Sequence, residues 1–121
     1  MDKERKKELM SQYKQTRPQM GIFIVRNNFN NKCHIQTTQD LRGVMNGAIA
    51  RLSGGFHPYR ELQQEVVAHG FGNFALEILE TLPYDKDDEM KTDYSEELKL
   101  LQMIWEEKLS KQNMVFYKKR I

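Results

Sequence analysis

The sequence has 121 residues, of which 39% are hydrophobic and 30% are charged, and its formal net charge is +2 at neutral pH. This length predicts one compact domain of ordinary globular composition, and no apolar run approaches the roughly 18 residues that a membrane span needs. The basic start of the chain is not followed by an apolar segment, so we expect a cytoplasmic protein with no secretory signal and no membrane partner. The only cysteine, Cys33, excludes an internal disulfide.

The first predicted element is a basic N-terminal helix over residues 2–14, within a segment that runs from 1 to 19. Asp2 is its candidate cap, and Leu9, Met10 and Tyr13 form a narrow apolar stripe. Pro18 ends it, because the residue before a proline disfavours the helical conformation.

A β-hairpin is predicted next. Residues 21–25 and 33–37 are rich in β-branched and other apolar side chains, and the asparagine-rich stretch 27–31 between them is typical of a turn.

Two helices are predicted after the hairpin. The first begins after a cap at Asp40, and its apolar residues recur at helical spacing: Leu41, Val44, Met45, Ala48, Ile49 and Leu52. Residues 53–55 end it, and a loop of residues 56–58 leads to a second helix over 59–69, which Gly70 closes.

A third strand over 74–80, ended by Pro83, and a long helix over 94–112 complete the predicted elements. Asp93 and Glu96 have capping-box spacing at the start of this helix, whose apolar face carries Leu98, Leu101 and Trp105. The tail 113–121 has no clear period. The pattern therefore indicates an α+β fold in which helices flank a small three-stranded antiparallel sheet.

The hairpin carries a resemblance to a known family. Gly21-Ile22-Phe23 followed by His34-Ile35-Gln36 resembles the hairpin that gives the GIY-YIG nuclease superfamily its name. The similarity extends over roughly 20–109, within the predicted domain 20–112, and includes further matching positions: Lys32, the phrase His57-x-x-x-x-Leu62-Gln63, residues 74–84, and Ile104-Trp105-x-x-x-Leu109.

This resemblance implies metal-assisted phosphodiester hydrolysis, but the residues at the family's functional positions differ. The two tyrosines correspond to Phe23, which has no hydroxyl, and to His34, which can act as a base. The arginine that stabilises the phosphate corresponds to Val44, and the glutamate that holds a divalent cation corresponds to Gln102. Only His57 is retained, so we expect a catalytically inactive member with no cofactor.

Three functions stay open. The first is a weak DNA- or RNA-binding module that uses basic side chains: Arg26, Lys32, Arg42, Arg51, His57 and Arg60. The second is a protein-interaction or structural module that assembles with itself or with another protein through the N-terminal helix. The third is a divergent endonuclease that uses His34 and binds Mg²⁺ through Glu106, one helical turn after Gln102.

Overall fold

The computed structural model describes residues 3–5 and 17–117 of the chain. Along the sequence the elements are β1 (Met20–Asn27), β2 (Lys32–Thr38), α2 (Leu41–Gly54), α3 (Arg60–His69), the short 3₁₀ turn η1 (Phe71–Asn73), β3 (Phe74–Leu82), α4 (Ser95–Lys111) and β4 (Val115–Phe116). The predicted hairpin, the three later helices and the third strand are all present. Most of the predicted N-terminal helix, with Leu9, Met10 and Tyr13, lies outside the described residues.

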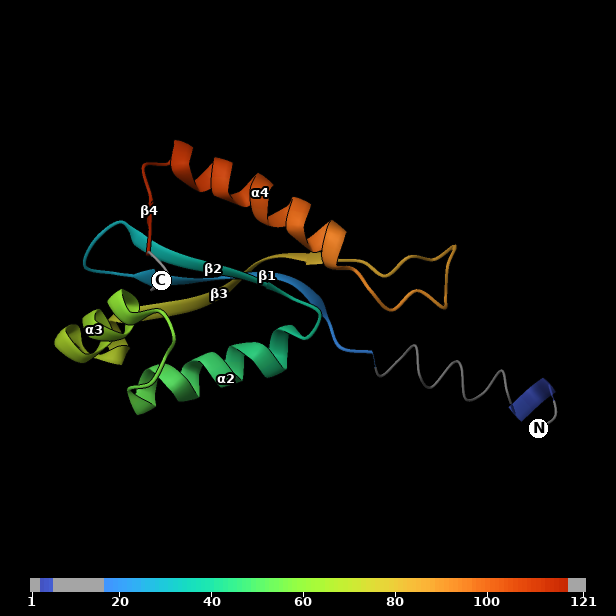
Figure 1. Ribbon diagram of the computed structural model, residues 1–121, viewed down its shortest axis with the longest axis horizontal. Helices are drawn as coiled ribbons and strands as arrows, with labels where there is room; N and C mark the ends of the chain where they lie inside the picture. Colours follow the sequence, from blue (N-terminus) through green and yellow to red (C-terminus); the bar gives the residue numbers. More distant parts are fainter. Residues whose placement is uncertain (1–2, 6–16, 118–121) are drawn as a thin grey trace.

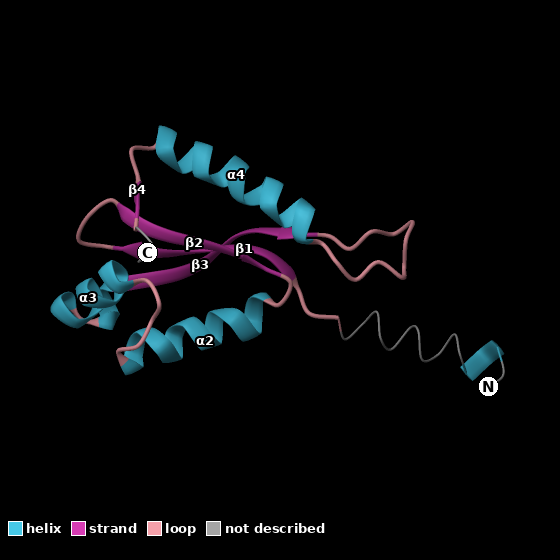
Figure 2. Ribbon diagram, in the orientation of Figure 1, coloured by secondary structure: helices cyan, strands magenta, loops and turns pink. Residues whose placement is uncertain are grey.

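The strands form one sheet in the order β3-β1-β2-β4, and helices cover both of its faces. Figure 1 shows α4 on one side of the sheet and α2 with α3 on the other, and Figure 2 shows the same three layers by type of element. A sheet covered on both faces must bury both sets of its side chains, so the described residues form two hydrophobic clusters rather than one.

The strand β1 lies between β3 and β2 and supplies both clusters. Ile22 and Ile24 pack in the cluster under α4, while Phe23 and Val25 pack in the cluster under α2 and α3. All four side chains are fully buried. Alternate residues of a strand point to opposite faces, which explains why residues 21–25 are an unbroken apolar run rather than an alternating one.

The glycine of the first motif is required by the close approach of β3. A β-carbon on Gly21 would collide with the carbonyl oxygen of Glu80 and would lie 2.8 Å from Cα of Thr81. The pairing of β1 with β3 is irregular between Ile22 and Phe23, next to this contact. Gly21 therefore fixes how closely the two strands pack.

The ends of α2 follow from the capping residues. An Oδ1 atom of Asp40 accepts a hydrogen bond from the backbone N–H of Gly43 at 3.1 Å, as expected for an N-cap. At the other end Gly55 adopts φ = 86°, a left-handed conformation that ends many helices. Ile49, predicted to face the core, is 37% exposed because it lies at the edge of the buried stripe.

The prediction of a three-stranded antiparallel sheet is wrong in two respects: within the described residues the sheet has four strands, and it is mixed. Val115 and Phe116 of β4 pair in parallel with Lys32 and Cys33 of β2. Two residues are too few to show an alternating pattern, so this strand had no local signal in the sequence. Residues of the predicted tail thus join the sheet.

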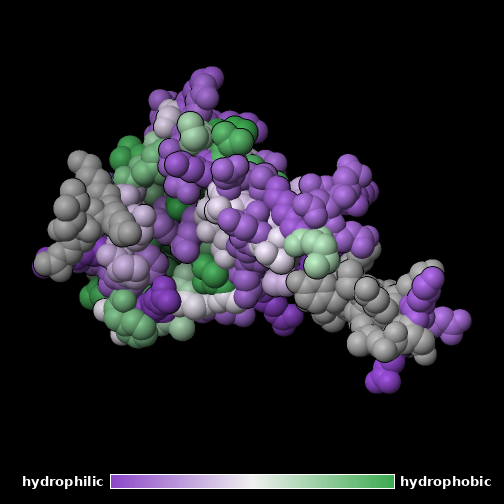
Figure 3. All heavy atoms as spheres, turned by 45° about the vertical axis from the view of Figure 1, so that its right-hand side comes forward, coloured by the Kyte–Doolittle hydropathy of each residue, from purple (hydrophilic) through white to green (hydrophobic). Residues whose placement is uncertain are grey.

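The described surface is largely hydrophilic, with small apolar groups. One of them lies over α4, at the top of Figure 3, where Leu100, Met103 and Ile104 are exposed. Within residues 3–5 and 17–117, none of the helices combines the length and the apolar character that crossing a bilayer requires.

Candidate functional site

Two of the five positions suggested by the resemblance lie in the core. Phe23 is fully buried under α2 and α3, and Val44 packs against the same cluster. Neither side chain can donate a proton or bind an anion. At these two positions the chain has apolar side chains that pack in a hydrophobic cluster.

The two histidines, in contrast, lie together with a tyrosine that sequence reasoning did not identify. His34 comes from β2, His57 from the loop after α2, and Tyr59 from the start of α3. The ring centroids of His34 and Tyr59 are 4.1 Å apart, and those of the two histidines are 5.6 Å apart. Both imidazoles are less than a tenth exposed.

This ring cluster forms one wall of a pocket of 380 Å³. Four consecutive residues of β2, from His34 to Thr37, line it, so the pocket meets the edge of the strand rather than one face of the sheet. Among the described residues, β4 pairs with Lys32 and Cys33 alone, so no described strand pairs with the rest of that edge. We call this the edge pocket.

Arg51 and Gln102 complete the edge pocket from the two helical layers. Arg51 is exposed and lies on α2, seven residues after Val44, which is almost two helical turns. The two residues therefore share one side of the helix. A guanidinium is present in the pocket although the position that corresponds to the family's arginine is apolar.

Burial controls the charge of the histidines. Burial first, and the neighbouring His57 second, lower the pKa of His34 to about 4 although a hydrogen bond with Gln36 acts against this shift. Burial and the positive charge of Arg51 also lower the pKa of His57. Both imidazoles are therefore neutral at pH 7, and each has one nitrogen that can accept a proton or a hydrogen bond.

Gln63 holds the loop that carries His57. Its Oε1 accepts a hydrogen bond from the backbone N–H of His57 at 2.8 Å, and its Nε2 donates to the carbonyl of Leu52 at 2.9 Å. The backbone N–H of Tyr59 donates to Nδ1 of His57 at 3.1 Å, which leaves the ring proton on Nε2. The resemblance included Gln63 but gave no reason for it; the reason is this double hydrogen bond.

The donor atoms near Gln102 do not fit a hard divalent cation. Its amide donates to Oε1 of Glu106 at 3.1 Å, so one carboxylate does lie beside it, as the sequence predicted. Magnesium and calcium need several oxygen ligands. Nowhere in residues 3–5 or 17–117 do three or more His, Cys, Asp or Glu side chains meet in a way that could hold a metal.

The six predicted nucleic-acid contacts do not form one surface. Arg51 and His57 line the edge pocket, and Arg60 lines a neighbouring pocket together with His57. Arg26 contacts Glu77 at 3.7 Å. Arg42 precedes Arg51 by nine residues, or two and a half helical turns, which places it on the opposite side of α2.

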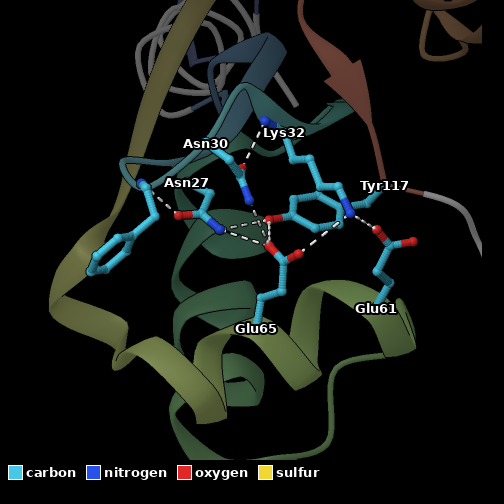
Figure 4. Close-up of polar contacts among 7 residues, drawn as sticks. Asn27, Asn30, Lys32, Glu61, Glu65 and Tyr117 are labelled. Atoms are coloured by element: carbon cyan, nitrogen blue, oxygen red, sulfur yellow. Dashed lines mark hydrogen bonds and ion pairs between the residues drawn. The ribbon is translucent and has the colours of Figure 1, made fainter.

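Lys32 belongs to a separate polar network, shown in Figure 4. Its ammonium lies between the carboxylates of Glu61 and Glu65, and the hydrogen bond with Glu61 is the main reason that its pKa is raised. Glu65 also accepts hydrogen bonds from the hydroxyl of Tyr117 and from Nδ2 of Asn27, the latter at 2.7 Å. This network joins α3 to the end of β1 and to the segment after β4.

Of three comparisons with known proteins, one found matches, and these concern the fold. Neither the family models nor the curated proteins include a match to this sequence. Among solved structures, the catalytic domain of the homing endonuclease I-TevI matches with a TM-score of 0.61 and 26% sequence identity, covering 82% of this chain and 98% of that domain. A glutamate-to-alanine mutant of the catalytic domain of this intron endonuclease matches with a TM-score of 0.60 and 25% identity, covering 85% of this chain and 97% of that one. The chain therefore has a GIY-YIG-like fold, similar to that of a homing-endonuclease catalytic domain.

Proposed function

We propose that this chain binds the phosphodiester backbone of nucleic acid at the edge pocket and does not carry out the metal-assisted cleavage of the nucleases that it resembles. The observation that carries the proposal is the position of Arg51 beside two neutral histidines in a pocket open at the edge of β2. A guanidinium presents several N–H donors in a plane that matches the oxygens of a phosphate.

The two histidines can contribute to phosphate binding, because a neutral imidazole needs no carboxylate partner beside it. His57 keeps a proton on Nε2, so its ring can donate a hydrogen bond to an anionic oxygen. The chemistry supports binding more than hydrolysis, because Phe23 and Val44 offer no proton and no positive charge, and a single nearby carboxylate is a poor site for magnesium.

The test is fluorescence anisotropy with labelled single-stranded, duplex and branched DNA and RNA, in magnesium, at low and near-physiological salt. We expect salt-sensitive binding with little sequence preference. Arg51→Ala should weaken it by about tenfold, the value of one lost charge-assisted hydrogen bond.

Arg42→Ala is the matched control, since it removes the same group from the opposite side of the same helix. Equal losses for the two variants would show that the charge of the helix matters and that the edge pocket does not. If no probe binds at low salt, the proposal fails and the protein-interaction alternative becomes the better one; the exposed apolar residues of α4 are then the first surface to change.

A divergent nuclease is the second candidate, and one observation favours it. His34, whose imidazole can accept a proton, shares the pocket with Arg51, whose guanidinium can contact a phosphate. Gels run on the endpoint samples of the binding experiment decide between the two. Cleavage that requires magnesium and is lost in His34→Gln would replace the binding proposal with this one.

A further inference from the structure

A second and larger pocket lies next to the edge pocket. Its volume is 610 Å³, and it shares His57 and Pro58 with the edge pocket. We call it the loop pocket, because Gly55, His57 and Pro58 of the loop between α2 and α3 line it together with residues of α3. The two pockets thus share one short wall of chain.

The lining of the loop pocket is mixed in a way that suits a nucleobase. Pro58 and Val67 supply apolar surface, and Val67 is 74% exposed although it is hydrophobic. Gln64 supplies an exposed amide that can both donate and accept hydrogen bonds. A base has flat apolar faces and an edge of donors and acceptors, and both features find partners here.

Positive charge lies on both sides of the shared wall. Arg51 lines the edge pocket and Arg60 lines the loop pocket. A guanidinium can contact a phosphate or stack on a base. In the same loop, Phe56 is 65% exposed and offers a further flat aromatic surface. Proteins that bind single strands combine basic side chains with aromatic surfaces on which bases stack.

We propose that the loop pocket binds one unpaired nucleotide of a strand whose phosphate is held at the edge pocket. The inference rests on the proposed function and makes it narrower: the ligand is single-stranded or has an unpaired segment. A paired base cannot use the loop pocket, since its hydrogen-bonding edge is occupied by its partner and its faces by its neighbours.

The experiment measures three labelled probes by fluorescence anisotropy at one salt concentration: a short single strand, the duplex of the same sequence, and a phosphodiester strand of equal length that has no bases. We expect the single strand to bind about tenfold more tightly than the strand without bases, which is the usual value of one well-placed base contact.

The pocket variant is the double substitution Gln64→Ala with Val67→Ala. Both side chains are exposed, so the fold should not depend on them. We expect this variant to bind the single strand as weakly as the strand without bases, and to bind the latter like the unmodified protein. Leu100→Ala with Met103→Ala on α4 is the control, since it removes exposed apolar side chains that line neither pocket.

Failure of this inference differs from failure of the proposed function. If Arg51→Ala weakens every probe but the pocket variant binds all three like the unmodified protein, the phosphate site stands and the nucleotide site does not. Tighter binding of the duplex than of the single strand also overturns the inference. If no probe binds, or if Arg51→Ala changes nothing, both are wrong.

Discussion

The substitution Tyr117→Phe tests the polar network of Figure 4 and removes a single oxygen. Tyr117 is buried, and its hydroxyl accepts a hydrogen bond from Nδ2 of Asn27 at 3.0 Å and donates one to Glu65. A hydrogen bond to a charged group contributes about 1.5 to 3 kcal/mol to stability. Glu65 keeps its contacts with Asn27 and Lys32 in the variant, so we expect a loss of about 2 kcal/mol.

The loss can be expressed as a change in melting temperature. Unfolding entropy is about 2.1 cal/mol/K per residue, or about 0.25 kcal/mol/K for this chain, so the expected decrease is about 8 °C. Thermal denaturation at pH 7, followed by circular dichroism, measures it. Tyr84→Phe is the control, because its hydroxyl donates to the neutral carbonyl of Pro18 in an exposed place and should cost less than about 1 kcal/mol.

The pH dependence gives a second readout of the same network. Burial raises the pKa of Glu65, but hydrogen bonds from Tyr117, Asn27 and Asn30 lower it by more, so the pKa in the folded state is below the ordinary value of 4.5. A carboxyl with a lowered pKa contributes stability above pH 4.5 that is lost as the pH falls through the folded value. The cost of Tyr117→Phe should therefore be smaller at pH 3 than at pH 7. Equal costs at both pH values, or a cost no larger than that of Tyr84→Phe, would refute the reasoning.

Three further predictions concern β1 and β2. Gly21→Ala should prevent the sheet from forming, since the new methyl group collides with the backbone of β3; we expect little folded protein by circular dichroism, and a variant that melts like the unmodified protein would contradict the contact. Stability should fall by up to about 3 kcal/mol between pH 6.5 and pH 4, because unfolding lets His34 take up a proton that its folded pKa of about 4 excludes, and His34→Gln should remove most of this fall in denaturant titrations at the two pH values. Burial raises the pKa of Cys33 to about 11, so a disulfide reagent at pH 8 should modify it only after denaturation; rapid labelling of the native protein would contradict this.

The sequence predicted the elements whose signals are local. The asparagine turn between two short apolar runs indicated the hairpin, and the recurrence of apolar residues after Asp40 indicated α2. Both are present, with Asp40 as the cap. Whether a residue at the edge of an apolar stripe is buried is harder to predict from the sequence, as the exposure of Ile49 shows.

Contacts between distant residues could not be predicted in the same way. The strand β4 has two residues, and its only signal is the partner strand. The hydrogen bond between Asn27 and Tyr117 joins residues 90 positions apart, and neither residue type indicates the other. Such pairs are known only once the fold has brought them together.

The candidate site was predicted in part: some of its residues could be named from the sequence, but their contacts with one another could not. The sequence named His34, His57 and Gln102 separately, from the resemblance, and the structure places all three at one pocket. It treated Arg42 and Arg51 alike, although their spacing of nine residues already implies opposite sides of a helix. The position of Tyr59 beside His34 depends on the loop between α2 and α3, which has no repeating pattern.

The parallel pairing of β4 with β2 also affects the order in which the chain folds. The two strands of the hairpin are joined by a short turn, whereas β4 and its partner β2 are separated by most of the chain. The entropy cost of closing a loop rises with its length, so the pairing of β4 is the more costly of the two to form. We therefore expect the contacts made by β4 and Tyr117 to form after the rate-limiting step. Substitutions there should speed unfolding and leave the folding rate nearly unchanged, so the short strand beside the edge pocket should also affect how long the native state lasts.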